Sequence, residues 1–126
     1  MKQKLPFPFV IEALDRLHPR IKPMFGCFAI YIGDKMVLML RQRPDYPHDN
    51  GVWLASPLEH HQSLKKEFPC MRSVSLLGKA ETVWQNIPID EDDFEELVLK
   101  ACGLILKGDV RIGKVPKERK NKANEK

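Results

Sequence analysis

The 126-residue sequence has few of the features that assign a chain to an enzyme or metal-binding class. It has three cysteines, an odd number, and their spacings match no zinc-binding or redox motif. Its seven glycines never cluster, so it has no phosphate-binding loop and no dinucleotide fingerprint. No HExxH, CxxC or GxSxG motif occurs. We therefore expect no cofactor, no metal and no enzymatic activity.

Long apolar runs are also missing. No stretch approaches the roughly 18 apolar residues that a membrane-spanning helix needs. The N-terminal segment does not fit a signal peptide, because Glu12 and Asp15 interrupt its apolar run. Cys27 and Cys102 lie in apolar stretches, which suits buried, reduced thiols. These features predict a cytoplasmic protein without a membrane contact.

The positive charge is concentrated at the C-terminal end. The chain carries a net charge of +4, of which residues 111–126 contribute seven Lys or Arg and two Glu. From Pro116 onward no large apolar residue occurs, so we expect a single domain over 1–115 and a disordered basic tail over 116–126. Such a tail either only keeps the chain solvated or adds affinity for phosphates that depends on salt and not on base sequence.

Periodicity and turn residues predict eight elements in the order α-β-β-β-α-β-β-α. The helices are expected at 8–18, 57–68 and 91–107, and the strands at 26–33, 35–43, 52–55, 71–77 and 82–88. Ser56 with Glu59 fits a capping box, Asp90 fits a cap of the last helix, and Gly33-Asp34 fits a two-residue turn. This order predicts an α+β fold: a two-layer sandwich in which helices pack on an antiparallel sheet of about five strands.

Aromatic and basic side chains supply the candidate binding residues. Trp53 and Trp84 fall on predicted strands, where tryptophan is more often part of the core than of a ligand site. His61 could line a pocket with Trp53, or it could be an ordinary helix histidine. Six basic residues are expected to be exposed, either as one basic face or as a scattered solvated surface: Arg41, Arg43, Lys65, Lys66, Arg72 and Lys79. The segment 111–117, which contains Lys114 and Lys117, could dock on the sheet ahead of the free tail.

Two segments resemble a known family. MFGCFAIYIGDKMVLML at 24–40 resembles the start of the TfoX/Sxy N-terminal domain, in which a Met-Phe-Gly segment leads into a hairpin. WQNIPIDEDDFEELVLKACGLI at 84–105 is similar to that family and to the related MmcQ/YjbR-like proteins. The resemblance covers about residues 9–115 and implies an α-β(3)-α-β(2)-α sandwich, similar to secretion-chaperone-like folds. It implies a link to competence regulation or DNA binding, and it transfers no catalytic residue.

The sequence therefore predicts a small bacterial TfoX/YjbR-like domain, a regulatory or interaction module that contacts nucleic acid or a protein partner. Exposed strand edges make a homodimer a further expectation. The alternative is a small-molecule-binding domain with a pocket near Trp53, His61 and Trp84. A third hypothesis is an enzyme that uses His61 as a base.

Overall fold

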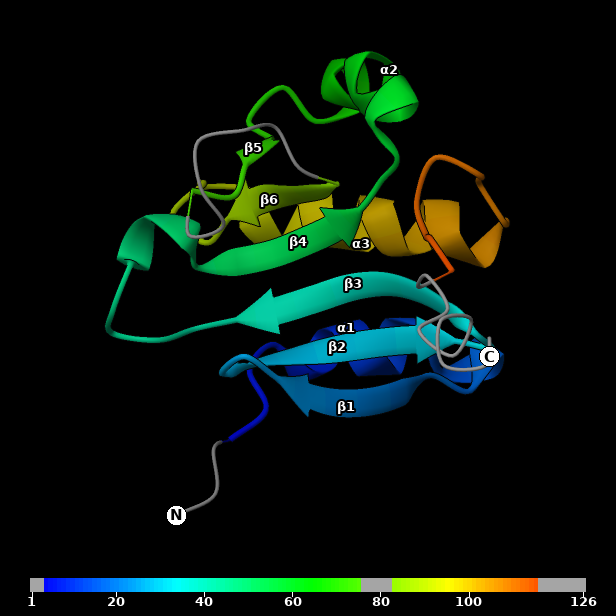
Figure 1. Cartoon of the computed structure of the whole chain (residues 1–126), viewed down its shortest axis with the longest axis horizontal. Coiled ribbons are helices and arrows are strands. Elements are labelled where there is room, and N and C mark those ends of the chain that lie inside the picture. Colours follow the sequence, from blue (N-terminus) through cyan, green and yellow to red (C-terminus); the bar gives the residue numbers. More distant parts are fainter. Residues whose placement is uncertain (1–3, 76–82, 116–126) are drawn as a thin grey trace, which may run out of the picture.

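The computed structural model, shown in Figure 1, describes residues 4–75 and 83–115. Its centre is one antiparallel sheet of six strands in the order β1-β2-β3-β4-β6-β5. The strands are β1 (Arg20–Met24), β2 (Cys27–Ile32), β3 (Lys35–Arg41), β4 (Gly51–Ala55), β5 (Arg72–Ser73) and β6 (Trp84–Pro88). The predicted α+β class and antiparallel sheet are confirmed.

The sheet has one strand more than the sequence predicts. Strand β1 pairs with β2 along its whole length, from Arg20 opposite Tyr31 to Met24 opposite Cys27. It contains Pro23, which has no N–H for a sheet ladder and is tolerated on an edge strand. Four of its five residues are exposed, so no buried apolar face marks this short segment as a strand.

The helices cover one face of the sheet. Figure 1 shows α1 (Pro8–Ala13) and α3 (Phe94–Leu106) behind the strands, and the two helices pack on each other. The Phe7 and Phe94 rings, 5.2 Å apart between centroids, join them. The third helix, α2 (His61–Glu67), lies beside β5 and β6 and inserts Leu64 into the same core.

Two predicted helix starts are wrong. The Ser56 backbone N–H donates to the Val83 carbonyl, and its hydroxyl donates to the Pro57 carbonyl, so Ser56 does not cap a helix. A 3-10 turn, η3 (Leu58–His60), follows, and α2 begins at His61, four residues later than predicted. Helix α3 begins at Phe94, with no side-chain cap from Asp90. At Ser56 a backbone hydrogen bond to a segment distant in sequence replaces the local cap.

Other boundaries also moved. The predicted helix 8–18 is divided into α1 and η1 (Asp15–Leu17), because Leu14 between them is not helical. The turn at Gly33-Asp34 is confirmed, since β2 ends at Ile32 and β3 starts at Lys35. Residues 76, 77 and 82 of the two later predicted strands lie outside the described residues, and so does the predicted tail.

The predicted docking of the segment after α3 is confirmed as far as residue 115. Lys114 exchanges two backbone hydrogen bonds with Met36, at 2.9 and 3.0 Å. Gly113 donates its N–H to the Ala55 carbonyl at 2.6 Å, and Ile112 is buried in the main core. The segment thus takes the free edge of β3 where β4 turns away after Ala55.

A cluster of charges holds this returning segment to α2. Both carboxylate oxygens of Asp109 accept hydrogen bonds from the Arg111 side chain, at 3.0 and 2.8 Å. Arg111 also donates to Ser63 and Glu67 on α2. The hydrogen bond from Arg111 is the main reason why the pKa of Asp109 falls to about 2.

We expect Asp109→Asn to lower the free energy of unfolding by about 1–2 kcal/mol at pH 7 and by almost nothing near pH 2. The folded-state pKa lies below the unfolded one, so the stabilisation is complete above pH 4 and disappears as the pH falls through 2. Urea unfolding of the native chain and of Asp109→Asn at both pH values measures this difference in the free energy of unfolding. Asp92→Asn, at an exposed carboxylate, is the control. If Asp109→Asn and Asp92→Asn lost equal free energy of unfolding at pH 7, the stabilising role of the Asp109–Arg111 pair would be contradicted.

Candidate functional site

The structure separates the predicted pocket residues into two places. Trp53 and Trp84 meet, with ring centroids 6.0 Å apart and planes at 56°. Both line an apolar pocket of about 150 Å³ on the sheet face opposite α1 and α3. His61 lines a different hollow, which shares no residue with the first.

That second hollow, here called the basic cleft, is formed by α2, β5 and β6 and has a volume of about 580 Å³. Its described lining residues are His61, Gln62, Lys65, Lys66, Arg72, Ser73 and Gln85. Figure 1 shows α2 standing over the β5–β6 end of the sheet. The β5–β6 register places Ser73 beside Gln85 and Arg72 beside Asn86, so the two strands bring side chains from distant parts of the chain under one helix.

In the described part of the chain, no acidic side chain neutralises the cations of the basic cleft. Lys65 donates to the Met71 carbonyl at 2.8 Å, and Arg72 donates to the His48 carbonyl at 2.8 Å. Both partners are neutral. Within the described residues, no carboxylate forms an ion pair with Lys65, Lys66 or Arg72, and none lines the cleft. Three positive charges therefore face a hollow large enough for a small ligand.

The predicted exposure of Arg41 is wrong. Its side chain is 1% exposed. One terminal nitrogen donates to the Tyr46 carbonyl and to Asn50 Oδ1, at 2.9 and 2.7 Å, and the other donates to the Asp45 carbonyl at 2.9 Å. The loop between β3 and β4 folds over Arg41 and turns its oxygens inward. Arg41 therefore holds the loop in place and does not face solvent.

The remaining predicted basic residues do not form one face. Arg43 is half-exposed and pairs with Asp45 at 3.1 Å, close to the Gly26 backbone. Lys114 lies at the other end of β3, beside Met36. Lys79 and Lys117 lie outside the described residues. Of the six residues expected to be exposed cations, three gather at the basic cleft: Lys65, Lys66 and Arg72.

His61 is nearly buried, with 7% exposure, and its Nε2 lies 2.8 Å from the Ser56 carbonyl. Because a carbonyl only accepts, Nε2 carries a hydrogen and donates to it. Among the residues that the structure describes, no three His, Cys, Asp or Glu side chains converge on a possible metal site.

Two of the cysteines are buried, as the sequence predicts. Burial raises the pKa of Cys102 to about 12 and raises the pKa of Cys27. Both therefore stay protonated thiols at neutral pH, which suits core residues. In the described part of the chain, no helix is long and apolar enough to cross a membrane.

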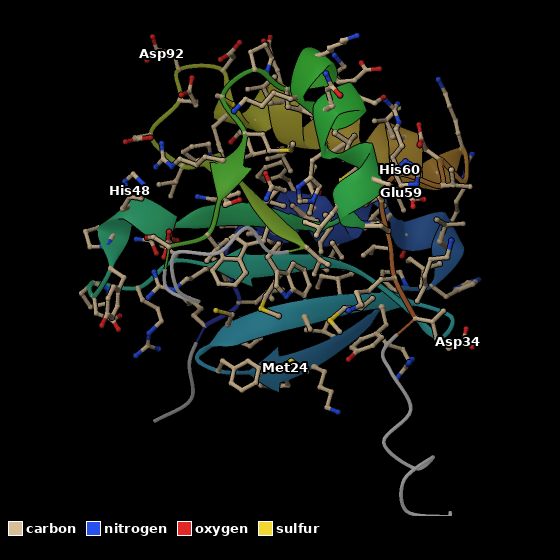
Figure 2. All side chains as sticks on the ribbon, turned by 45° about the horizontal axis from the view of Figure 1, so that its top comes forward. Met24, Asp34, His48, Glu59, His60 and Asp92 are labelled. Carbon is tan, nitrogen blue, oxygen red and sulfur yellow. The ribbon has the colours of Figure 1, made fainter. Side chains whose placement is uncertain are left out.

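The Met-rich part of the apolar pocket was missed by sequence reasoning. Met24, Met36 and Met39 line it together with Phe25 and Cys27. Met39 and Trp53 are directly opposite in the β3–β4 register, so alternation could have placed them on one face. The sequence predicts a first strand that starts at Gly26 and no strand before it. The turn at Phe25-Gly26, which brings Met24 and Phe25 to the pocket, was therefore not expected. Figure 2 labels Met24 on β1.

No family model, curated protein or solved structure matches this chain. The class defined by the coordinates alone is an α+β protein with an open six-stranded antiparallel sheet, whose N- and C-terminal helices pack together. The two hollows described above differ in chemistry, one basic and one apolar.

Proposed function

We propose that this protein is a small regulatory or interaction module of the TfoX/YjbR type that binds nucleic acid at the basic cleft. The observation that carries the proposal is the convergence of Lys65, Lys66 and Arg72 without a carboxylate partner among the described residues. Cations without acidic neighbours attract phosphates, and releasing condensed counterions from DNA favours such binding. The basic tail at 116–126 would add charge of the same sign.

The neutral groups of the cleft suit phosphate and sugar contacts. Ser73 and Gln85 hydrogen-bond each other at 2.8 Å beneath α2, and Gln62 stands beside the lysines. Most protein–DNA hydrogen bonds go to phosphate and sugar, from side chains of these types. The cleft presents no helix of more than seven residues to read a groove, so we expect backbone contacts more than base readout.

The proposal is of a binding protein and not of an enzyme. His61 is the titratable side chain in the cleft that resembles a general base, and its Nε2 is held by the Ser56 carbonyl.

The homodimer stays a prediction. The outer strand β1 carries Lys22 and Pro23, residue types that protect an exposed edge from pairing.

We expect the double variant Lys65→Gln/Lys66→Gln to bind a labelled DNA duplex about tenfold more weakly near 0.1 M salt. The slope of log affinity against log salt should become shallower by about 1.8, since two phosphate contacts are lost. Fluorescence anisotropy of the full chain over a salt series measures both quantities. The matched control is Lys22→Gln/Lys107→Gln, which makes the same charge change at exposed positions outside the cleft.

Equal losses in the two double variants would reject the cleft, because the effect would then come from net charge alone. Unchanged binding in both would place the contact elsewhere on the chain. If the native chain binds no duplex at 0.1 M salt, the nucleic-acid function is rejected, and a protein partner with an acidic surface becomes the better candidate.

A further inference from the structure

The apolar pocket between β1, β3, β4 and β6 has the features of a ligand site, independently of the basic cleft. Its seven described lining residues are Met24, Phe25, Cys27, Met36, Met39, Trp53 and Trp84, none of them charged. Two of its polar atoms already have partners: Trp53 Nε1 donates to the Asp49 carbonyl at 2.8 Å, and Cys27 Sγ lies 3.7 Å from the Phe25 carbonyl. The pocket therefore favours an apolar occupant over a charged one.

Phe25 at the rim is held in an unfavourable state. It has φ +53° and is followed by Gly26 with φ +76°, so the β1–β2 hairpin has positive φ at both turn residues. Such turns prefer Asn-Gly or Asp-Gly, and a bulky residue in this region costs about 1 kcal/mol. Phe25 is also 85% exposed. The backbone conformation disfavours a phenylalanine at this position, and the exposed ring gains little from burial in the core. Strained residues of this kind concentrate at ligand sites.

A cation beside the Phe25-Gly26 turn is already neutralised. The guanidinium of Arg43 lies against Gly26, about 3 Å from where a Cβ would project. Its Nε pairs with Asp45 at 3.1 Å. An anionic ligand would have to compete with this carboxylate, whereas an uncharged ligand would leave the pair intact.

We infer that this pocket binds one uncharged aromatic ring of a small molecule, with Phe25 as its outer wall. A volume of about 150 Å³ matches a single benzene-sized ring. The three methionines supply polarisable, flexible walls that adapt to a flat ligand, and sulfur–aromatic contacts add to the attraction. The tilted pair of Trp53 and Trp84 offers both a ring face and a ring edge.

Intrinsic fluorescence tests this directly, because the chain has two tryptophans and both line the pocket. Benzene titrated into the full chain, with excitation at 295 nm, should give a saturable change in emission. Cyclohexane should bind about fivefold more weakly, since it lacks the aromatic interactions. Benzoate, which carries a charge, should give no saturable change.

The variant Phe25→Asn should weaken benzene binding about fivefold, because it removes one aromatic wall. It should not unfold the protein, since Asn-Gly suits this turn. The matched control is Tyr46→Asn. Tyr46 is also an exposed aromatic residue with positive φ, +47°, but it does not line the pocket. Its variant should bind benzene as the native chain does.

Absence of a saturable signal with benzene would overturn the inference. If cyclohexane bound as tightly as benzene, or if the Phe25 and Tyr46 variants lost benzene affinity equally, the proposal of an aromatic ligand would be overturned. A dimer in sedimentation analysis that Phe25→Asn dissociates would assign the pocket to a second copy of the chain and would also overturn it. Weaker benzene binding in Phe25→Asn, with native binding in Tyr46→Asn, supports the inference.

Discussion

The substitution Gly51→Ala should destabilise the protein by about 4 kcal/mol and lower its melting temperature by roughly 15 °C. Gly51 begins β4 and is paired with Arg41 on one side and Pro88 on the other. A Cβ at this residue would overlap the backbone carbonyl oxygen of Ile87 and come within 2.5 Å of Asn86 Oδ1. Its φ of +146° adds strain for any side chain. The overlap involves backbone, which cannot rotate away.

The matched control is Gly103→Ala in the interior of α3. An added Cβ there meets nothing within 4 Å, and alanine favours helix over glycine. This variant should gain about 0.5–1 kcal/mol in the free energy of unfolding. Thermal and urea unfolding compare the two. A cost below about 1 kcal/mol for Gly51→Ala would show that β4 and β6 can separate without loss, contrary to the register described above.

The substitution Arg41→Met should cost about 3 kcal/mol. Methionine keeps the length of the side chain but removes the donors to the Tyr46 carbonyl, the Asp45 carbonyl and Asn50 Oδ1. These acceptors would lose the hydrogen bonds from Arg41 while the loop still covers them, although the Asp49 N–H still donates to the Tyr46 carbonyl and the Arg43 N–H to Asn50 Oδ1. Because the same loop supplies the Asp49 carbonyl that holds Trp53 Nε1, tryptophan emission should shift with the loss of stability.

Arg43→Met is the comparison for that variant. Arg43 is 36% exposed in its side chain and pairs with one carboxylate at the surface, so its replacement should cost less than about 1 kcal/mol. Urea unfolding followed by tryptophan fluorescence gives both values. Similar costs for the two arginines would mean that Arg41 is not the residue that orders the loop.

The strands could be predicted where two nearly continuous apolar runs, now seen to be buried, flank a turn signal. Both strands around Gly33-Asp34 were located to within two residues at that turn, and the fold class followed from the element order. Strand β1 was missed, since its residues are mostly exposed and it exists through pairing with β2. The helix starts predicted at Ser56 and Asp90 rested on local capping patterns. A hydrogen bond from the Ser56 N–H to the Val83 carbonyl overrides the pattern at Ser56. Helix α3 begins at Phe94, later than a cap at Asp90 implies.

The candidate sites depended still more on tertiary structure. Alternation along β3 places Arg41 on the same face as Met39, but it does not reveal that the following loop covers this face. Lys65 and Arg72 come together because β5 pairs with β6 beneath α2, a contact that no local pattern encodes. The same holds for Trp53 and Trp84, which share a pocket from which His61 is absent.

The sequence by itself therefore determined the α+β class, the hairpin around Gly33-Asp34 and the burial of Cys27 and Cys102, and it offered the return of the segment after α3 as one possibility. These follow from composition and short-range periodicity, which describe what each residue prefers next to its neighbours in the chain. The tertiary structure alone decided which cations are buried, which have no acidic partner among the described residues and which aromatic rings meet. Those outcomes depend on residues far apart in sequence and on the surfaces that cover each face of the sheet.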